Sequence, residues 1–106
     1  MRLLTKEIEN RFIKVGCQEG KGYDAEVIVK FFDPCGSWTW YATEYDPSTR
    51  EFFGHVCGFE NEWGNFSLDE LQSVRNRLGL GLERDMHFGR KTVREALVAE
   101  RGVQVA

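Results

Sequence analysis

Residues 25–59 read AEVIVKFF-DPCGS-WTWYATEY-DPSTR-EFFGHVCGF, three runs rich in β-branched and aromatic residues separated by two short turn sequences. Such runs are typical of β-strands. In the first turn Asp33, Pro34 and Gly36 occupy the first, second and fourth positions, which suits a type I turn. Strands joined by short turns pair in antiparallel fashion. The stretch therefore predicts an antiparallel meander with strands over residues 25–32, 38–45 and 51–59.

Helical signals flank this meander on both sides. Thr5 can cap a helix that carries Ile8 and Phe12 on one face. Ser67 and Thr92 each stand three residues before a glutamate, which is the capping-box spacing. The predicted helices cover residues 6–14, 68–77 and 93–101, glycines at 79 and 81 end the second of them, and further short strands are expected at 63–66 and 82–88. We therefore expect an α+β fold, with an antiparallel sheet of three to five strands and two or three short helices, in a single domain over residues 1–106.

Aromatic side chains lie on both faces of the predicted sheet. Strict alternation places Trp38, Trp40, Ala42 and Glu44 on one face of the second strand, and Thr39, Tyr41, Thr43 and Tyr45 on the other. A sheet of this kind needs cover on both faces, or it leaves one face for a partner.

The charge is distributed unevenly along the chain. Residues 24–70 hold ten acidic and two basic side chains, a balance of −8, whereas residues 1–23 carry +2 and residues 71–106 carry +3. A phosphate backbone is bound by Lys and Arg, so this composition argues against direct nucleic-acid binding. It suits a basic protein surface better. The alternative is that these acids are solvated outer faces of strands.

Motifs for catalysis or metal binding are sparse. His55 and Cys57 are two residues apart, but the chain has no CxxC pair and no HExxH, so we expect no metal site and no cofactor. The glycines at 79 and 81 follow a predicted helix, which is the wrong end for binding an anion. The pairs Glu44 with Asp46 and Glu60 with Glu62 could each share a strand face, and they leave a carboxylate-dependent hydrolase open as an alternative.

The expected compartment is the cytoplasm. The first residues contain no apolar signal-peptide stretch, and no run approaches the ~20 apolar residues that span a membrane. The three cysteines, Cys17, Cys35 and Cys57, are therefore expected to be reduced thiols.

Three segments carry a family resemblance: residues 3–12, residues 29–44, and residues 66–71 together with 80–88. On these segments the chain resembles a bacterial family of small uncharacterised proteins, a domain of unknown function, carried on plasmids, phages and conjugative elements. The resemblance implies a setting and no catalytic residues. Accessory proteins of mobile elements often block host defences by binding restriction or CRISPR complexes.

Together these observations predict a non-enzymatic binding protein of a mobile genetic element. We expect a counter-defence inhibitor, anti-CRISPR or anti-restriction, that binds a host DNA-targeting complex through an acidic, aromatic-rich sheet surface. The predicted partner-binding residues are Glu44, Tyr45, Asp46, Glu51, Glu60 and Glu62.

Three alternatives stay open. A single-stranded-DNA accessory protein for conjugation would stack bases on Trp40 or Tyr41. A small hydrolase would hold Glu44 in a pocket. The same surface could also join two copies of the chain in a homodimer.

Overall fold

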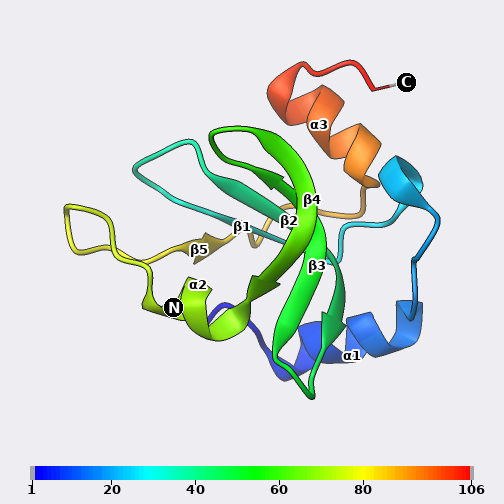
Figure 1. Ribbon diagram of the computed structural model, residues 1–106, viewed down its shortest axis with the longest axis horizontal. Coiled ribbons are helices and arrows are strands. Elements are labelled where there is room, and N and C mark those ends of the chain that lie inside the picture. The colour runs from blue at the N-terminus through cyan, green and yellow to red at the C-terminus, as the bar shows by residue number, and fades with distance from the viewer. Residues whose placement is uncertain (1, 106) are drawn as a thin grey trace.

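The computed structural model describes residues 2–105 and has an α+β fold, as predicted. One antiparallel sheet contains five strands in the order β4-β3-β2-β1-β5. The strands are β1 (Val29–Phe32), β2 (Thr39–Asp46), β3 (Glu51–Cys57), β4 (Asn61–Ser67) and β5 (Glu83–Arg84). The helices are α1 (Lys6–Val15), α2 (Leu68–Ser73), α3 (Val93–Arg101) and the short 3-10 helix η1 (Gly22–Asp24). In Figure 1 the strands run between α3 at the top and α1 at the bottom. None of the helices within residues 2–105 is long and apolar enough to cross a membrane.

All three predicted helix starts are confirmed by their caps. The Thr5 hydroxyl accepts a hydrogen bond from the Ile8 amide at 3.2 Å, and the Ser67 hydroxyl accepts one from the Glu70 amide at 3.3 Å. Thr92 forms the full capping box: its hydroxyl accepts from the Glu95 amide, and its own amide donates to the Glu95 carboxylate. These bonds satisfy amides that the first helical turn leaves without partners.

Several predicted boundaries are wrong. The helix predicted over 68–77 ends at Ser73, because Val74 adopts an extended conformation. The loop that follows is organised by Asn76, whose side-chain oxygen accepts hydrogen bonds from the amides of Leu78 and Leu80. Glycine at 79 therefore lies within this loop and does not end the helix. The strand predicted over 25–32 begins at Val29, the third strand ends at Cys57, and the strand predicted over 82–88 has only two residues.

A β-bulge interrupts β2 and reverses its alternation. The register with β3 shifts between Ala42 and Glu44, which leaves Thr43 as the extra residue. Beyond the bulge Tyr45 joins the face of Ala42, and Glu44 pairs directly with Phe53 on the other face. The predicted faces of Glu44 and Tyr45 are therefore exchanged.

Both faces of the sheet are covered. The first core packs α1, α2 and the N-terminal segment against one face, and it contains Leu3, Leu4, Ile8, Phe12, Ile28, Val29, Phe31, Ala42, Phe52, Phe66, Leu68, Leu71 and Leu82. The second core packs α3 against the other face, and it contains Val27, Tyr41, Cys57, Phe88, Val93, Ala96 and Leu97. The need for cover on both faces follows from the aromatic residues on both sides of β2 and β3.

A partly buried polar network attaches α3 to the sheet. The Tyr41 hydroxyl donates to the Glu100 carboxylate at 2.7 Å, and the Lys30 ammonium lies 3.0 Å from the same carboxylate. Burial, followed by the hydrogen bond to Glu100, raises the pKa of Tyr41 above its ordinary value.

This network predicts a loss of stability in alkali. Above about pH 10 the unfolded chain ionises its tyrosines while Tyr41 stays protonated in the fold, so the free energy of unfolding must fall as pH rises. Tyr41→Phe should flatten that fall between pH 9 and about pH 11, measured by urea unfolding at each pH. An equally steep fall in the variant would contradict this assignment.

A glycine pair in β3 and β4 gives a matched test of the packing. Gly54 and Gly64 are register partners, yet a Cβ on Gly54 would lie 1.9 Å from the Tyr41 carbonyl oxygen, whereas a Cβ on Gly64 would meet nothing within 4 Å. Gly54→Ala should lower the free energy of unfolding by about 1–3 kcal/mol or more. Gly64→Ala should leave it unchanged or raise it by about 0.4–1 kcal/mol. Equal effects in chemical denaturation would contradict the observed packing.

Candidate functional site

The six predicted partner-binding residues do not form one surface. Glu44, Tyr45, Asp46 and Glu51 lie at the turn between β2 and β3, whereas Glu60 and Glu62 lie at the turn between β3 and β4. The seven residues of β3 separate these two ends, a distance of about 20 Å at ~3.3 Å per residue. The two groups of acids therefore need separate interpretations.

Asp46 and Tyr45, near the β2–β3 turn, have structural roles. The Asp46 carboxylate accepts hydrogen bonds from the Ser48 hydroxyl at 2.7 Å and the Ser48 amide at 2.9 Å. These bonds hold the pKa of Asp46 below its usual value. The Tyr45 ring packs against Phe12 and Phe52, with ring centroids 5.8 and 4.8 Å away. Asp46 therefore stabilises the β2–β3 turn, and Tyr45 packs in the first core.

The β3–β4 end carries an aromatic cluster in which Phe59 is exposed and Trp38 and Trp40 are half-buried. The two indole rings stack with centroids 5.7 Å apart, and Phe59 meets Trp38 edge to face at 5.3 Å. Phe59 is 94% exposed. Gly58 makes room for this arrangement, because a Cβ there would lie 2.3 Å from the Trp38 ring.

Two acids adjoin the cluster. Glu60 follows Phe59 in the turn, and its carbonyl accepts a hydrogen bond from the Gly58 amide at 3.0 Å. Glu62 pairs with Val56, which in turn pairs with Trp40, so these three form one row across the strands. Within residues 2–105 neither glutamate forms an ion pair. The aromatic–acidic surface is defined here as Trp38, Trp40, Phe59, Glu60 and Glu62.

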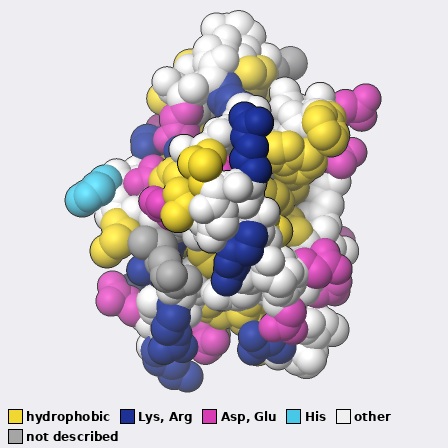
Figure 2. Space-filling model, turned by 90° about the vertical axis from the view of Figure 1, so that its left-hand side faces the viewer, with side chains coloured by type: hydrophobic (Ala, Val, Ile, Leu, Met, Phe, Trp, Pro, Cys, Tyr) yellow, Lys and Arg dark blue, Asp and Glu magenta, His cyan; other side chains and the backbone are white. Residues whose placement is uncertain are grey.

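Further apolar side chains project on the same side of the molecule. Leu78 and Leu80 are exposed in the loop after α2, and the Asn76 amide donates to Asp33 at 3.3 Å, which ties this loop to the turn before Trp38. Figure 2 shows this side, where hydrophobic side chains lie on either side of central Lys and Arg side chains and acidic ones lie mainly towards the edges. Large contiguous patches of exposed apolar side chains often mark sites of interaction with other molecules.

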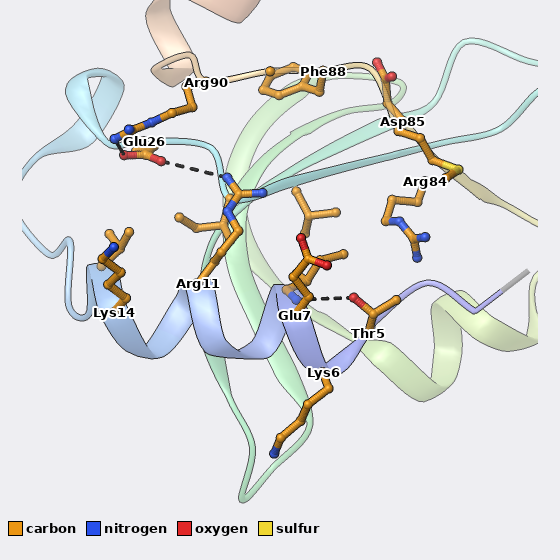
Figure 3. Close-up of a pocket in the computed structure, with 16 residues that line it drawn as sticks. Thr5, Lys6, Glu7, Arg11, Lys14, Glu26, Arg84, Asp85, Phe88 and Arg90 are labelled. Carbon is orange, nitrogen blue, oxygen red and sulfur yellow. Dashed lines mark hydrogen bonds and ion pairs between the residues drawn. The ribbon is translucent and has the colours of Figure 1, made fainter.

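A groove of about 940 Å³ runs between α1 and residues 84–90 (Figure 3). Its charged lining is mixed in sign, with five basic side chains, Lys6, Arg11, Lys14, Arg84 and Arg90, and three acidic ones, Glu7, Glu26 and Asp85. Glu26 lies 3.9 Å from Arg11 and 3.5 Å from Arg90, so it neutralises part of this lining. A nucleic-acid backbone would meet three carboxylates here as well as five cations, so the groove matches it less well than an uninterrupted basic lining would.

Glu44 lines a second pocket, of about 580 Å³. Phe53 and Trp63 form one wall, and the loop that contains Gln18 forms another. Asp46, the predicted catalytic partner of Glu44 in the hydrolase alternative, does not line this pocket. The structure therefore gives Glu44 a pocket but does not bring the predicted pair together in it.

His55 and Cys57 are buried neighbours, with Nδ1 and Sγ 3.7 Å apart. Burial raises the pKa of the Cys57 thiol and lowers that of the His55 imidazole. Both shifts favour neutral groups, which opposes a reactive thiolate. Across residues 2–105 no group of His, Cys, Asp or Glu could hold a metal ion.

Sequence reasoning missed Phe59 and Gln18. The strand predicted over 51–59 includes Phe59, although Gly58 and Asn61 on either side of it are turn-forming residues that indicate an exposed position. Gln18 has no such signal, because its three hydrogen-bond partners come from the distant backbones of Glu26 and Thr43.

The role of Asp46 can be tested by titration. Ser48→Ala should raise the pKa of Asp46 towards its ordinary value, because the hydroxyl and its hydrogen bond are lost. Carboxyl NMR titration measures this, and Asp69, whose pKa is lowered by Arg50, provides the internal control. An unchanged Asp46 titration would show that the serine does not hold this carboxylate.

The family described as "Protein of unknown function (DUF2958)" matches residues 3–99. No curated protein and no solved structure matches the chain.

Proposed function

The chain belongs to the family of proteins of unknown function DUF2958, and from this premise we propose that it is a non-enzymatic protein-binding module that docks its partner through the aromatic–acidic surface. One observation carries the proposal. Phe59 is 94% exposed in the turn after β3 and belongs to neither core, and it meets Trp38, one of two stacked tryptophans, edge to face.

Aromatic anchors of this kind are the side chains that contribute most to protein–protein affinity. Trp is enriched among the few interface residues whose truncation costs the most binding energy, and such residues cluster at the centre of an interface. Trp38 and Trp40 are half-buried and fixed by their contacts, so little side-chain entropy remains to be lost on docking.

The adjoining charges indicate a basic partner. Glu60 and Glu62 are exposed and form no ion pairs with the described residues, so both carboxylates can face a partner's Lys or Arg. Complementary charges of this kind accelerate association and exclude wrong partners.

The partner in this proposal is a host DNA-targeting complex, of the restriction or CRISPR type, met in the cytoplasm. This part rests on the resemblance to proteins of mobile elements. A nuclease presents a basic groove to DNA, and carboxylates can occupy such a groove in place of phosphates. Of the acids in residues 24–70, the exposed Glu60 and Glu62 lie on the aromatic–acidic surface and support the match.

The single-stranded-DNA alternative has weaker support. Tyr41 is fully buried and cannot stack a base, which leaves only the tryptophan pair. Glu60 and Glu62 beside that pair would repel a phosphate backbone.

A pull-down compares the two acidic ends of the sheet. The tagged chain, incubated with lysate of a defence-proficient bacterium, should retain a nuclease or CRISPR subunit identified by mass spectrometry. Phe59→Ser combined with Glu60→Lys and Glu62→Lys should reduce retention about tenfold or more, since anchor and charge complementarity are both lost. Glu51→Lys, at the opposite end of β3, is the matched control and should not reduce it.

Three outcomes would contradict the proposal. If the wild type and the triple variant retained the same amount of the same subunit, the aromatic–acidic surface would not be the docking site. Salt-sensitive binding of an oligonucleotide, with no protein retained, would favour the conjugation alternative. A wild-type dimer that becomes monomeric with Phe59→Ser, measured by analytical ultracentrifugation, would assign the surface to self-association. Circular dichroism checks that the variants fold.

A further inference from the structure

The pocket that holds Glu44 lies on the opposite face of the sheet from the row of Trp40, Val56 and Glu62. Glu44 is the register partner of Phe53, and Phe53 stacks on Trp63 with centroids 6.0 Å apart and planes 12° apart. Together these three side chains form a wall with one carboxylate beside two aromatic rings. The pocket volume, about 580 Å³, falls within the ~300–1,000 Å³ typical of ligand sites.

A buried glutamine fixes the opposite wall. Gln18 is 3% exposed, and its side-chain amide donates to the carbonyls of Glu26 at 2.8 Å and Thr43 at 2.9 Å. Its side-chain oxygen accepts from the Glu26 amide at 2.7 Å. These bonds hold the loop that contains Glu19, Gly20 and Gly22 against β2 at its bulge, so the pocket has a formed shape before any ligand binds.

The charged side chains that line the pocket are all acidic. Glu19 and Glu44 line it, and among the described residues no Lys or Arg does. Within residues 2–105 neither of these carboxylates has a hydrogen-bond or ion-pair partner. Glu44 is half-buried, and a ligand cation that enters the pocket would meet its carboxylate without competition from a Lys or Arg of the lining.

The aromatic wall favours the same ligand charge. Ring faces of Trp and Phe attract cations through their quadrupole, most strongly where water is displaced. Two independent features of the lining, the unpaired carboxylates and the stacked rings, therefore select a cation with a flat or apolar surface.

We propose that this pocket accepts the guanidinium group of an arginine side chain of a partner protein. A guanidinium is planar, stacks on an aromatic face, and donates two parallel hydrogen bonds to one carboxylate. A lysine ammonium is a compact, strongly hydrated charge that uses the ring wall less well. The inference goes beyond the proposed function, because it concerns another face of the sheet and does not need the aromatic–acidic surface.

Peptide titrations test the site directly. The probe is the blocked tripeptide Gly-Arg-Gly, and its control is the same peptide with citrulline, which keeps the shape of arginine without the charge. The Trp63 indole NMR signal of the intact chain should shift on adding the arginine peptide and barely move with citrulline. Free arginine, whose own carboxylate would approach Glu19 and Glu44, should bind more weakly than the blocked peptide.

Matched variants test whether Glu44 and Phe53 bind the arginine peptide. Glu44→Gln removes the charge at almost constant shape and should weaken binding of the arginine peptide about threefold to tenfold. Phe53→Leu should weaken it as well, because one ring face is lost. Glu51→Gln, an exposed acid on the same strand as Phe53 but outside the pocket, should leave it unchanged.

Several results would overturn the inference: equal binding of arginine and citrulline peptides, tighter binding of free arginine, or an unchanged affinity in Glu44→Gln. The triple variant at Phe59, Glu60 and Glu62 separates the two proposals, because it should lose the pulled-down partner and keep the peptide affinity.

Discussion

The hydrogen bonds between Gln18 and the bulge of β2 are the constraint on which the arrangement of this sheet depends. A bulge leaves backbone groups without strand partners, and buried groups of that kind are costly unless they are satisfied. Here the Gln18 amide binds the Thr43 carbonyl, while the Thr43 hydroxyl donates to the Phe53 carbonyl. With the bulge held in place, Tyr45 packs in the first core, and Glu44 lies on the opposite face beside Phe53.

Because both faces of the sheet are covered, its aromatic side chains reach solvent only near the edges of the two cores. The two cores account for most of the large apolar side chains of the sheet. Phe59, in contrast, lies beyond the end of β3, and Phe53 lies at the margin of the loop before η1. The aromatic–acidic surface and the Glu44 pocket occupy these two margins. Both proposals therefore arise from the same property, a strand composition that is aromatic on both sides.

The sequence was most informative where structure is determined locally. Thr5, Ser67 and Thr92 cap their helices through bonds to amides three residues away, so short-range spacing was enough to locate the helix starts. The bulge at Thr43 depends on the distant side chain of Gln18, which no local pattern contains. The end of α2 comes from the extended Val74 and from the loop bonds of Asn76, which the apolar helical spacing did not indicate. The six acidic and aromatic site residues were grouped because they are close in sequence, but hairpin strands carry Glu51 and Glu60 to opposite ends of the sheet.

Gln18 attaches a surface loop to the sheet, and this attachment lets the loop vary in length while the sheet stays the same. The loop around it contains Gly16, Gly20 and Gly22, all with positive φ, and it lies on the pocket without contributing a strand. Surface loops tolerate insertions and deletions far better than paired strands do. Changes in loop length on either side of Gln18 would therefore reshape one wall of the pocket while the bulge and both cores stay intact. The shape of the pocket and the stability of the sheet therefore depend on different parts of the chain, and Gln18 is the side chain that joins them.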